Sequence, residues 1–176
     1  MNRFFFFDID TQIDFMFPAG ALYVPGAERI VPVIAQLNQC AEIVVSTMCA
    51  HQENDPEFRQ WPPHCVVGTA GQQKPQSTLR PSGQIILEKQ KLDLFTNPDL
   101  PKLLEELAAD EYVVYGVVTE YCVRHAVLGL LKTGRPVTLV TDAIRSVRAE
   151  DGDSVIQAFT AAGGRLATSS KLLPMR

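Results

Sequence analysis

The sequence predicts an α/β fold with three layers, Rossmann-like in arrangement, in which helices flank a central, mostly parallel sheet of six strands. Two observations support this fold class. Short apolar runs bounded by turn residues alternate with stretches of helical periodicity, which is the pattern of βαβ units around a parallel sheet. The chain has 176 residues, 46% of them hydrophobic, so we expect a single domain over 1–176 that buries a sizeable core.

Six segments have the composition of buried strands. The first starts with the run Phe4 to Phe7. Because Asp8 and Asp10 interrupt this run, it is too short for a membrane span or the core of a signal peptide. The expected strands, in chain order, are 3–9, 42–47, 84–88, 111–117, 136–141 and a short last one at 165–168.

Four further segments have apolar residues at helical spacing. Their apolar stripes are Ile30, Ile34 and Leu37; Leu100, Leu103, Leu104 and Leu107; Val123, Val127, Leu130 and Leu131; and Val155, Ile156 and Phe159. Gly134 and the pair Gly163-Gly164 are expected to end the last two helices. The segment 48–83 fits neither pattern, and its length and aromatic content indicate an ordered loop that builds a functional site.

Charge and cysteine content narrow the classes of partner. The formal net charge of −4 disfavours nucleic acid and anionic membranes, because these partners need clustered Lys and Arg. We therefore expect a small-molecule substrate, with no nucleic-acid or membrane partner. The four cysteines, Cys40, Cys49, Cys65 and Cys122, include no CxxC pair. This pattern is typical of a reducing compartment, so we expect a cytoplasmic protein.

The ends of the predicted strands indicate where a site would form, because ligands of an open parallel sheet bind at the carboxyl ends of its strands. Asp10 follows the first strand, Lys89 the third, and Cys122 lies on a turn after the fourth. If the first and fourth strands are neighbours, Asp10 and Cys122 flank one crevice, where the carboxylate can accept the thiol proton. A helix start capped by Thr119 would favour a thiolate. The alternative is that Cys122 only packs in the core.

His125 is a competing base, because it follows Cys122 by three residues and lies on the same helical face. A histidine one turn deeper along the helix would lie behind the nucleophile and not over the crevice. We therefore expect a structural role for His125. Asp14 is likewise expected to serve a turn or a helix cap.

Three motifs carry a family resemblance. The opening DTQIDF at 10–15, followed by PAGAL at 18–22, resembles the start of the isochorismatase-like cysteine hydrolases, which include nicotinamidases. Lys89, six residues before Phe95, is similar to the catalytic lysine of this family, and GVVTEYCV at 116–123 is similar to its nucleophile turn. The resemblance spans nearly the whole chain and is closest, in its motifs, to the nicotinamidases.

By position, the resemblance implies that Asp10 is the general base and acid, Lys89 its electrostatic partner, and Cys122 the nucleophile. It also implies a cis peptide bond between Val117 and Val118, which would direct the Val118 N–H group toward the same oxyanion as the Cys122 N–H group. The implied reaction is a cysteine-dependent deamidation of nicotinamide to nicotinate and ammonia through a thioester on Cys122.

The long loop departs from the resemblance at one position. Nicotinamidase-like members have Asp-x-His after the second strand, then a further ligand, then a histidine in a Trp-Pro-Pro-His-Cys segment. The corresponding residues here are Cys49, His51, Glu57 and His64. Cysteine, histidine and carboxylate side chains all bind zinc, so the resemblance implies a divalent metal, with zinc as the first choice. The exchange of Asp for Cys49 would either shift the site toward softer metals or abolish it.

Phe15 and Trp61 match family positions that wall the nicotinamide pocket, and aromatic walls suit a flat ring. Core packing is the alternative for both, and no organic cofactor is implied.

Two other functions stay open. One is hydrolysis of a different small amide, a ureido compound or, as in isochorismatases, a vinyl ether; the other is a catalytically silent binding role, which the joint presence of Asp10, Lys89 and Cys122 argues against. Because members of the family often form dimers or tetramers, we also expect a homo-oligomer.

Overall fold

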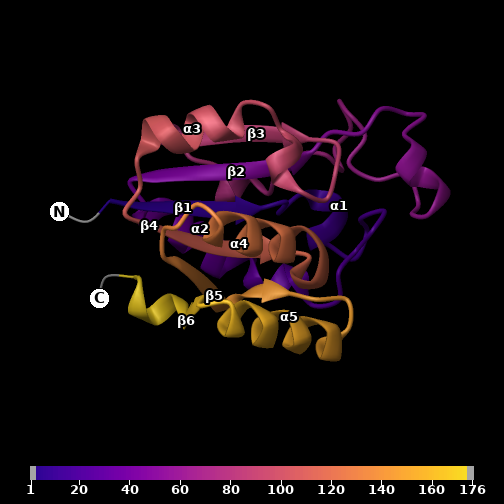
Figure 1. Cartoon of the computed structure of the whole chain (residues 1–176). Helices are drawn as coiled ribbons and strands as arrows, with labels where there is room; N and C mark the ends of the chain where they lie inside the picture. Colours follow the sequence, from indigo (N-terminus) through magenta and orange to yellow (C-terminus); the bar gives the residue numbers. More distant parts are fainter. Residues whose placement is uncertain (1–2, 174–176) are drawn as a thin grey trace.

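The computed structural model, which describes residues 3–173, has a six-stranded parallel sheet between two layers of helices (Figure 1). The strands are β1 (Phe4–Ile9), β2 (Ile43–Cys49), β3 (Gln84–Lys89), β4 (Glu111–Val117), β5 (Val137–Arg145) and β6 (Arg165–Ala167). Their order is β3-β2-β1-β4-β5-β6, so the direction of winding reverses between β1 and β4, where open α/β sheets bind ligands. The predicted fold class is confirmed, and the first and fourth strands are neighbours.

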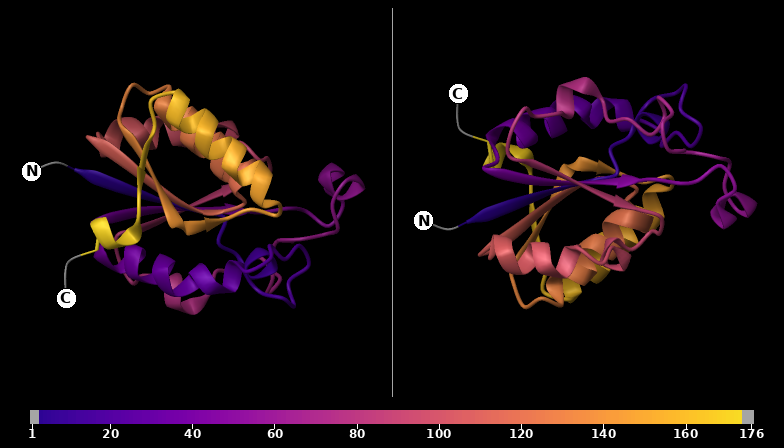
Figure 2. Two further views of the ribbon diagram at one scale, coloured as in Figure 1. Left: turned by 90° about the horizontal axis from the view of Figure 1, so that it is seen from below. Right: turned by 90° about the horizontal axis from the view of Figure 1, so that it is seen from above.

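The helices divide between the two faces of the sheet (Figure 2). Helix α2 (Val31–Cys40) covers one face, and α3 (Leu100–Leu107), α4 (Arg124–Leu131) and α5 (Ala149–Ala161) cover the other. The short helix α1 (Ile13–Met16) follows β1 directly. The remaining helical turns are η1 (Ala27–Ile30), η2 (Pro56–Arg59), η3 (Gln76–Thr78), η4 (Leu94–Thr96), η5 (Thr119–Val123) and η6 (Ser169–Lys171). All four predicted helices are present. Helix α1 was not predicted, because four residues are too few to show apolar periodicity.

Strand β1 supplies the core on both faces of the sheet. Phe5, Phe7 and Ile9 pack in the cluster that includes residues of α3, α4 and α5, whereas Phe6 packs in the cluster on the side of α2. Because successive side chains of a strand point to opposite faces, a strand covered on both sides needs apolar residues at consecutive positions. Two-sided burial therefore explains the unbroken phenylalanine run.

Strand β5 continues well beyond its predicted end at Thr141. The pairing of β4 with β5 shifts between Val114 and Gly116 and resumes with Gly116 opposite Ile144. The polar residues Thr141 and Asp142 fall in this irregular part and interrupt the apolar run, which is why the sequence pattern ends there. Gly116 has a φ of 119°, and a Cβ atom there would lie 2.2 Å from the carbonyl oxygen of Ile9, so the close approach of β4 to β1 requires glycine.

The long loop is anchored to the sheet although part of it projects from the carboxyl edge (Figure 2). A β-bridge joins His51 to Val66. Further along, the buried Lys74 ammonium lies 3.1 Å from the Asp8 carboxylate and donates to Thr11 Oγ1 at 2.7 Å. The loop is therefore held at its base by a buried ion pair next to the end of β1, where the predicted site lies.

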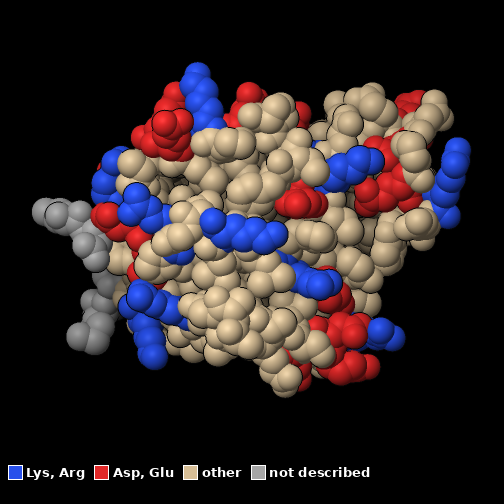
Figure 3. All heavy atoms as spheres, in the orientation of Figure 1, with Lys and Arg blue, Asp and Glu red and all other residues tan. Residues whose placement is uncertain are grey.

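The surface carries both signs of charge. Lys and Arg side chains are interspersed with Asp and Glu on the face shown in Figure 3, in keeping with the small net charge of −4. Within residues 3–173, helices long and apolar enough to cross a lipid bilayer are absent.

Candidate active site

Asp10, Lys89 and Cys122 meet at the carboxyl edge of the sheet, although they come from β1, β3 and the turn after β4. Lys89 Nζ lies 2.7 Å from Asp10 Oδ2 and 3.6 Å from Cys122 Sγ. All three side chains are buried. The structure thus places a carboxylate, an ammonium and a thiol in contact with one another.

The backbone around Asp10 fixes the direction of its carboxylate. Asp10 has a φ of 47°, a left-handed conformation that is uncommon for residues other than glycine. The Thr47 hydroxyl donates to Asp10 Oδ1 at 2.6 Å and accepts from the Asp10 N–H group at 3.1 Å. One carboxylate oxygen is therefore bound by Thr47 and the other faces Lys89.

The buried pair of Asp10 and Lys89 is ionised. Burial alone would raise the pKa of the Asp10 carboxyl, but the charge of Lys89 and hydrogen bonds from Cys122, Lys89 and Thr47 outweigh burial and lower this pKa below 3.8. Burial also opposes the charge of Lys89. The negative charge of Asp10 and the neighbouring sulfurs nevertheless raise the pKa of Lys89 well above 10.5. Both charged forms therefore persist at neutral pH.

Cys122 lies in the π-helical turn η5 and not in helix α4. The N-cap residue is Val118 and no side chain caps the turn, so the predicted cap by Thr119 is wrong; Thr119 is buried instead. The hydrogen bond with the Cys49 sulfur, together with burial, raises the pKa of Cys122 well above 9.0. The raised pKa favours the thiol form of Cys122, whereas a helix start would favour a thiolate, and the Asp10 carboxylate is an acceptor for the thiol proton.

Cys49, predicted as a metal ligand, contacts this charged cluster. Its sulfur lies 3.3 Å from Lys89 Nζ. The Gln12 side chain donates to the Cys49 carbonyl at 2.8 Å and accepts from the Cys49 N–H group at 2.7 Å, which fixes the end of β2. The hydrogen bond from Cys122 lowers the pKa of Cys49 to about 6, although burial opposes this shift.

The peptide bond between Val117 and Val118 is cis, at the position that the resemblance implies. The Val118 carbonyl accepts hydrogen bonds from the N–H groups of Tyr121 and Val123, each at 3.1 Å. These bonds anchor the turn that carries Cys122 to the end of β4.

The long loop brings together His51, Glu57 and His64, which offer one ligand atom each within 4.8 Å of one another. His51 Nδ1 lies 2.9 Å from Asp55 Oδ2, and His64 Nδ1 donates to the Pro62 carbonyl at 2.8 Å. These bonds orient the rings so that each keeps Nε2 available, as in histidines that bind metals. His51 Nε2 is buried without a hydrogen-bond partner. An orphaned nitrogen beside a second histidine and a carboxylate fits a divalent cation.

The electrostatic surroundings of His51 also suit a cation. Burial lowers the pKa of this ring, but contacts with Cys49 and Asp55 and the charge of Glu57 raise it to about 9. Positive charge is thus favoured at this ring. Cys49 lies outside the group of three, because Gln12 fixes its backbone and Lys89 binds its sulfur.

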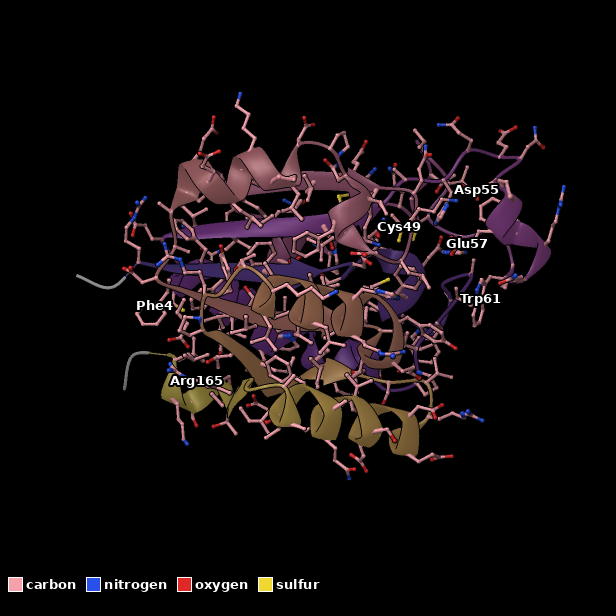
Figure 4. All side chains as sticks on the ribbon, in the orientation of Figure 1. Phe4, Cys49, Asp55, Glu57, Trp61 and Arg165 are labelled. Atoms are coloured by element: carbon pink, nitrogen blue, oxygen red, sulfur yellow. The ribbon has the colours of Figure 1, made fainter. Side chains whose placement is uncertain are left out.

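The two groups of side chains come from different parts of the molecule (Figure 4). Glu57 and Trp61 lie on the projecting segment of the loop, whereas Cys49 lies further inside, at the end of β2. Phe4 and Arg165 mark the opposite end of the sheet. The site therefore forms where the loop folds back over the carboxyl edge.

A cavity of about 140 Å³ connects the two groups. Its lining includes Cys49 and Cys122 from the charged cluster and Glu57 and His64 from the candidate metal group. The cavity is smaller than the clefts of roughly 300–1,000 Å³ that bind drug-sized ligands. It therefore suits a molecule with a single ring.

The walls of this cavity are mainly apolar. The predicted pocket residues Phe15 and Trp61 both line it, and the Trp61 ring packs edge-on against Tyr121 with 5.5 Å between the ring centroids. Sequence reasoning missed six other wall residues, which are Leu22, Tyr23, Val24, Leu92, Tyr121 and Val147. Tyr121 could have been inferred because it precedes Cys122, but the other five come from three separate segments that only the fold brings together.

His125 and Asp14 lie outside the charged cluster. His125 is in α4, and it neither lines the cavity nor belongs to the candidate metal group. The Asp14 carboxylate accepts from the N–H groups of Ala21 and Cys65, at 3.0 and 2.7 Å. Asp14 therefore serves the turns around the site, and by binding Cys65 it also holds the segment that carries His64.

Comparison with protein families identifies the matching domain. The model of the isochorismatase domain matches residues 5–171. The nicotinamidase of Escherichia coli (strain K12) is 28% identical to the chain over 197 residues, covering 91% of this chain and 92% of the relative. The nicotinamidase of Acinetobacter baylyi is 26% identical over 171 residues, covering 79% of each.

Solved structures agree with this match. The pyrazinamidase of Pyrococcus horikoshii in complex with zinc superposes with a TM-score of 0.86 at 29% identity, covering 94% of this chain and 99% of that chain. The structure of PnC1 from L. infantum in complex with nicotinate superposes with a TM-score of 0.89 at 26% identity, covering 96% and 94%. Each of these proteins resembles the chain over nearly its whole length.

The buried ion pair predicts how stability depends on pH. Asp10→Asn leaves the Lys89 charge without its carboxylate, so we expect a loss of about 3–5 kcal/mol in the free energy of unfolding at neutral pH. Because the pKa of Asp10 is lowered in the folded state, its stabilisation is present above 3.8 and is lost as the pH falls through the folded value. The difference between wild type and Asp10→Asn, measured by urea denaturation, should therefore shrink in acid.

Asp153→Asn is the matched control, because Asp153 is exposed on α5. It should change the free energy of unfolding by less than about 0.5 kcal/mol at neutral pH. A difference between wild type and Asp10→Asn that stays constant from neutral pH to well below 3.8 would contradict an ionised Asp10.

Proposed function

Because the chain belongs to the isochorismatase family, we propose that it hydrolyses a small aromatic amide, with nicotinamide as the leading substrate, to the carboxylic acid and ammonia. One observation carries this proposal. Asp10, Lys89 and Cys122 are in contact beside a small cavity with apolar walls. The nucleophile Cys122 therefore faces the space that a flat amide can occupy, and its base and charge partner contact it directly.

The first half of the reaction uses Cys122 and Asp10. The Cys122 thiol gives its proton to the Asp10 carboxylate, and the sulfur attacks the carbonyl carbon of the amide. The N–H groups of Val118 and Cys122 are proposed to hold the resulting oxyanion. Asp10 then returns the proton to the departing nitrogen, so that ammonia leaves and a thioester remains on Cys122.

The second half regenerates the enzyme. Asp10, again ionised, takes a proton from a water molecule, and the hydroxide attacks the thioester carbonyl. The carbon–sulfur bond breaks, the acid leaves, and Asp10 returns the proton to the Cys122 sulfur. Lys89 acts throughout by keeping the Asp10 carboxylate charged between proton transfers.

The chemistry of the cavity favours a neutral substrate. Glu57 is the one acidic residue in its lining, and the described lining contains neither Lys nor Arg. A vinyl ether with carboxylate groups, the kind of compound that isochorismatases hydrolyse, would find no Lys or Arg side chain in this described lining to pair with. Phe15, Trp61 and Tyr121 instead offer faces and edges for a flat ring.

We also propose that zinc is the metal held by His51, Glu57 and His64. When bound, the metal supplies an electrophilic centre to which the ring nitrogen of the substrate can attach. The chain's own contribution is to orient the ligands. Asp55 and the Pro62 carbonyl fix the two histidine rings, and Asp14 fixes the segment after His64.

Removal of the nucleophile tests the reaction. Cys122→Ser should lower kcat/KM for nicotinamide, measured as ammonia released, by about 10³-fold or more, because the weakly basic Asp10 carboxylate removes a proton from a serine hydroxyl far less readily than from a thiol. Cys40→Ser is the matched control, since Cys40 is exposed on α2, and it should retain wild-type turnover.

Pyrazinamide and isochorismate, assayed in parallel, separate the candidate substrates. Preference for the two aromatic amides is expected. Rapid hydrolysis of isochorismate, or turnover of nicotinamide that survives in Cys122→Ser, would overturn the proposed function.

The metal group has its own test. His64→Ala should lower the metal content of the purified protein, measured by elemental analysis after growth with added zinc, from about one ion per chain to a small fraction, because two ligands rarely hold zinc. His125→Ala is the matched control and should keep the ion. Equal metal content in both variants, or none in wild type, would rule out this site.

A further inference from the structure

The charged cluster contains two thiols, and the proposed hydrolysis uses only one of them. Cys49 Sγ and Cys122 Sγ lie 3.3 and 3.6 Å from the same Lys89 nitrogen. Both belong to the lining of the substrate cavity, so a small oxidant that enters the cavity can reach both.

We propose that Cys49 and Cys122 form a reversible disulfide when a hydroperoxide oxidises the site, and that this bond switches the hydrolase off. The proposal concerns the two sulfurs and does not depend on which amide is the substrate. Cys49 is the residue that stands where the resemblance implies an aspartate, so the pair is a property of this sequence.

The oxidation balances in two steps. One of the two sulfurs attacks the peroxide, the O–O bond breaks, an alcohol or water leaves, and the sulfur becomes a sulfenic acid. The other sulfur then attacks this sulfenic sulfur, the S–O bond breaks, and water leaves as the disulfide forms. In total, two thiols lose two hydrogen atoms and one peroxide is reduced. A dithiol reverses the change by thiol–disulfide exchange.

The positions of the four cysteines make this pair specific. Cys40 is exposed on α2, where its thiol donates to the Leu37 carbonyl at 3.3 Å. Cys65 is buried, and its backbone N–H group is bound by Asp14. Among the described cysteines, the sulfurs that contact Lys89 are those of Cys49 and Cys122.

Gln12 and Lys89 hold the pair ready for bond formation. A disulfide needs the sulfurs to approach to about 2.05 Å. Gln12 fixes the backbone of Cys49 through its N–H and carbonyl groups, and the Lys89 ammonium contacts both sulfurs, at 3.3 and 3.6 Å, so they lie around one nitrogen. Once the bond forms, Cys122 has no free sulfur to attack a carbonyl.

The test uses Cys40→Ser protein, because trypsin then releases each remaining cysteine on a separate peptide. These peptides are 30–59 with Cys49, 60–89 with Cys65, and 103–124 with Cys122. After treatment with hydrogen peroxide, quenching with catalase and blocking of free thiols, we expect the protein to lose the mass of two hydrogen atoms and peptides 30–59 and 103–124 to be linked. Dithiothreitol should restore the two separate peptides and the activity.

The double variant Cys40→Ser, Cys49→Ser extends the test to the sulfenic acid. It should form no linked peptide, and a diketone probe for sulfenic acids should label 103–124 more strongly than in the single variant. Near-ultraviolet circular dichroism reports whether this variant keeps its fold. Two results in Cys40→Ser protein would overturn the proposal: a link between 60–89 and either other peptide in place of the expected one, or oxidation of Cys122 to sulfinic acid without any link.

Discussion

One buried ammonium group organises the site. Lys89 Nζ contacts a carboxylate oxygen of Asp10 and the sulfurs of Cys49 and Cys122. A buried charge is costly unless it is paired, so the fold must deliver Asp10 to it. The left-handed turn at Asp10 and the hydroxyl of Thr47 meet this requirement. The same ammonium keeps Asp10 ionised, and an ionised Asp10 can accept the proton of Cys122.

The scaffold follows from the hydrophobic pattern, because a sheet covered on both faces needs uninterrupted apolar strands. The sequence therefore predicts all six strands and the crevice between β1 and β4. It does not predict the far end of β5, because Thr141 and Asp142 interrupt the apolar run while the strand continues past a register shift. The apolar pattern of a sequence indicates which residues are buried. The far part of β5 is held by its pairing with β4, which the apolar pattern does not indicate.

The catalytic candidates could be located from sequence because each one follows a predicted strand and parallel strands end at one edge. The protonation state of the nucleophile could not be predicted from the sequence. A helix start predicts a thiolate, whereas Cys122 lies in a π-helical turn beside the sulfur of Cys49, which favours the thiol. The position of Cys49 could not be predicted from the sequence either, because it depends on two side chains from other segments, Gln12 from the turn after β1 and Lys89 from β3.

In the proposed hydrolysis Cys122, and not its neighbour Cys49, receives the acyl group. The direct measurement is to mix the enzyme with nicotinamide, quench the reaction with acid within the first turnover, digest with pepsin and locate the added mass. We expect a nicotinoyl group on the peptide that contains Cys122, and we expect it to be absent when Cys122 is replaced by serine. A nicotinoyl group on Cys49, or turnover with neither sulfur acylated, would contradict this role of Cys122.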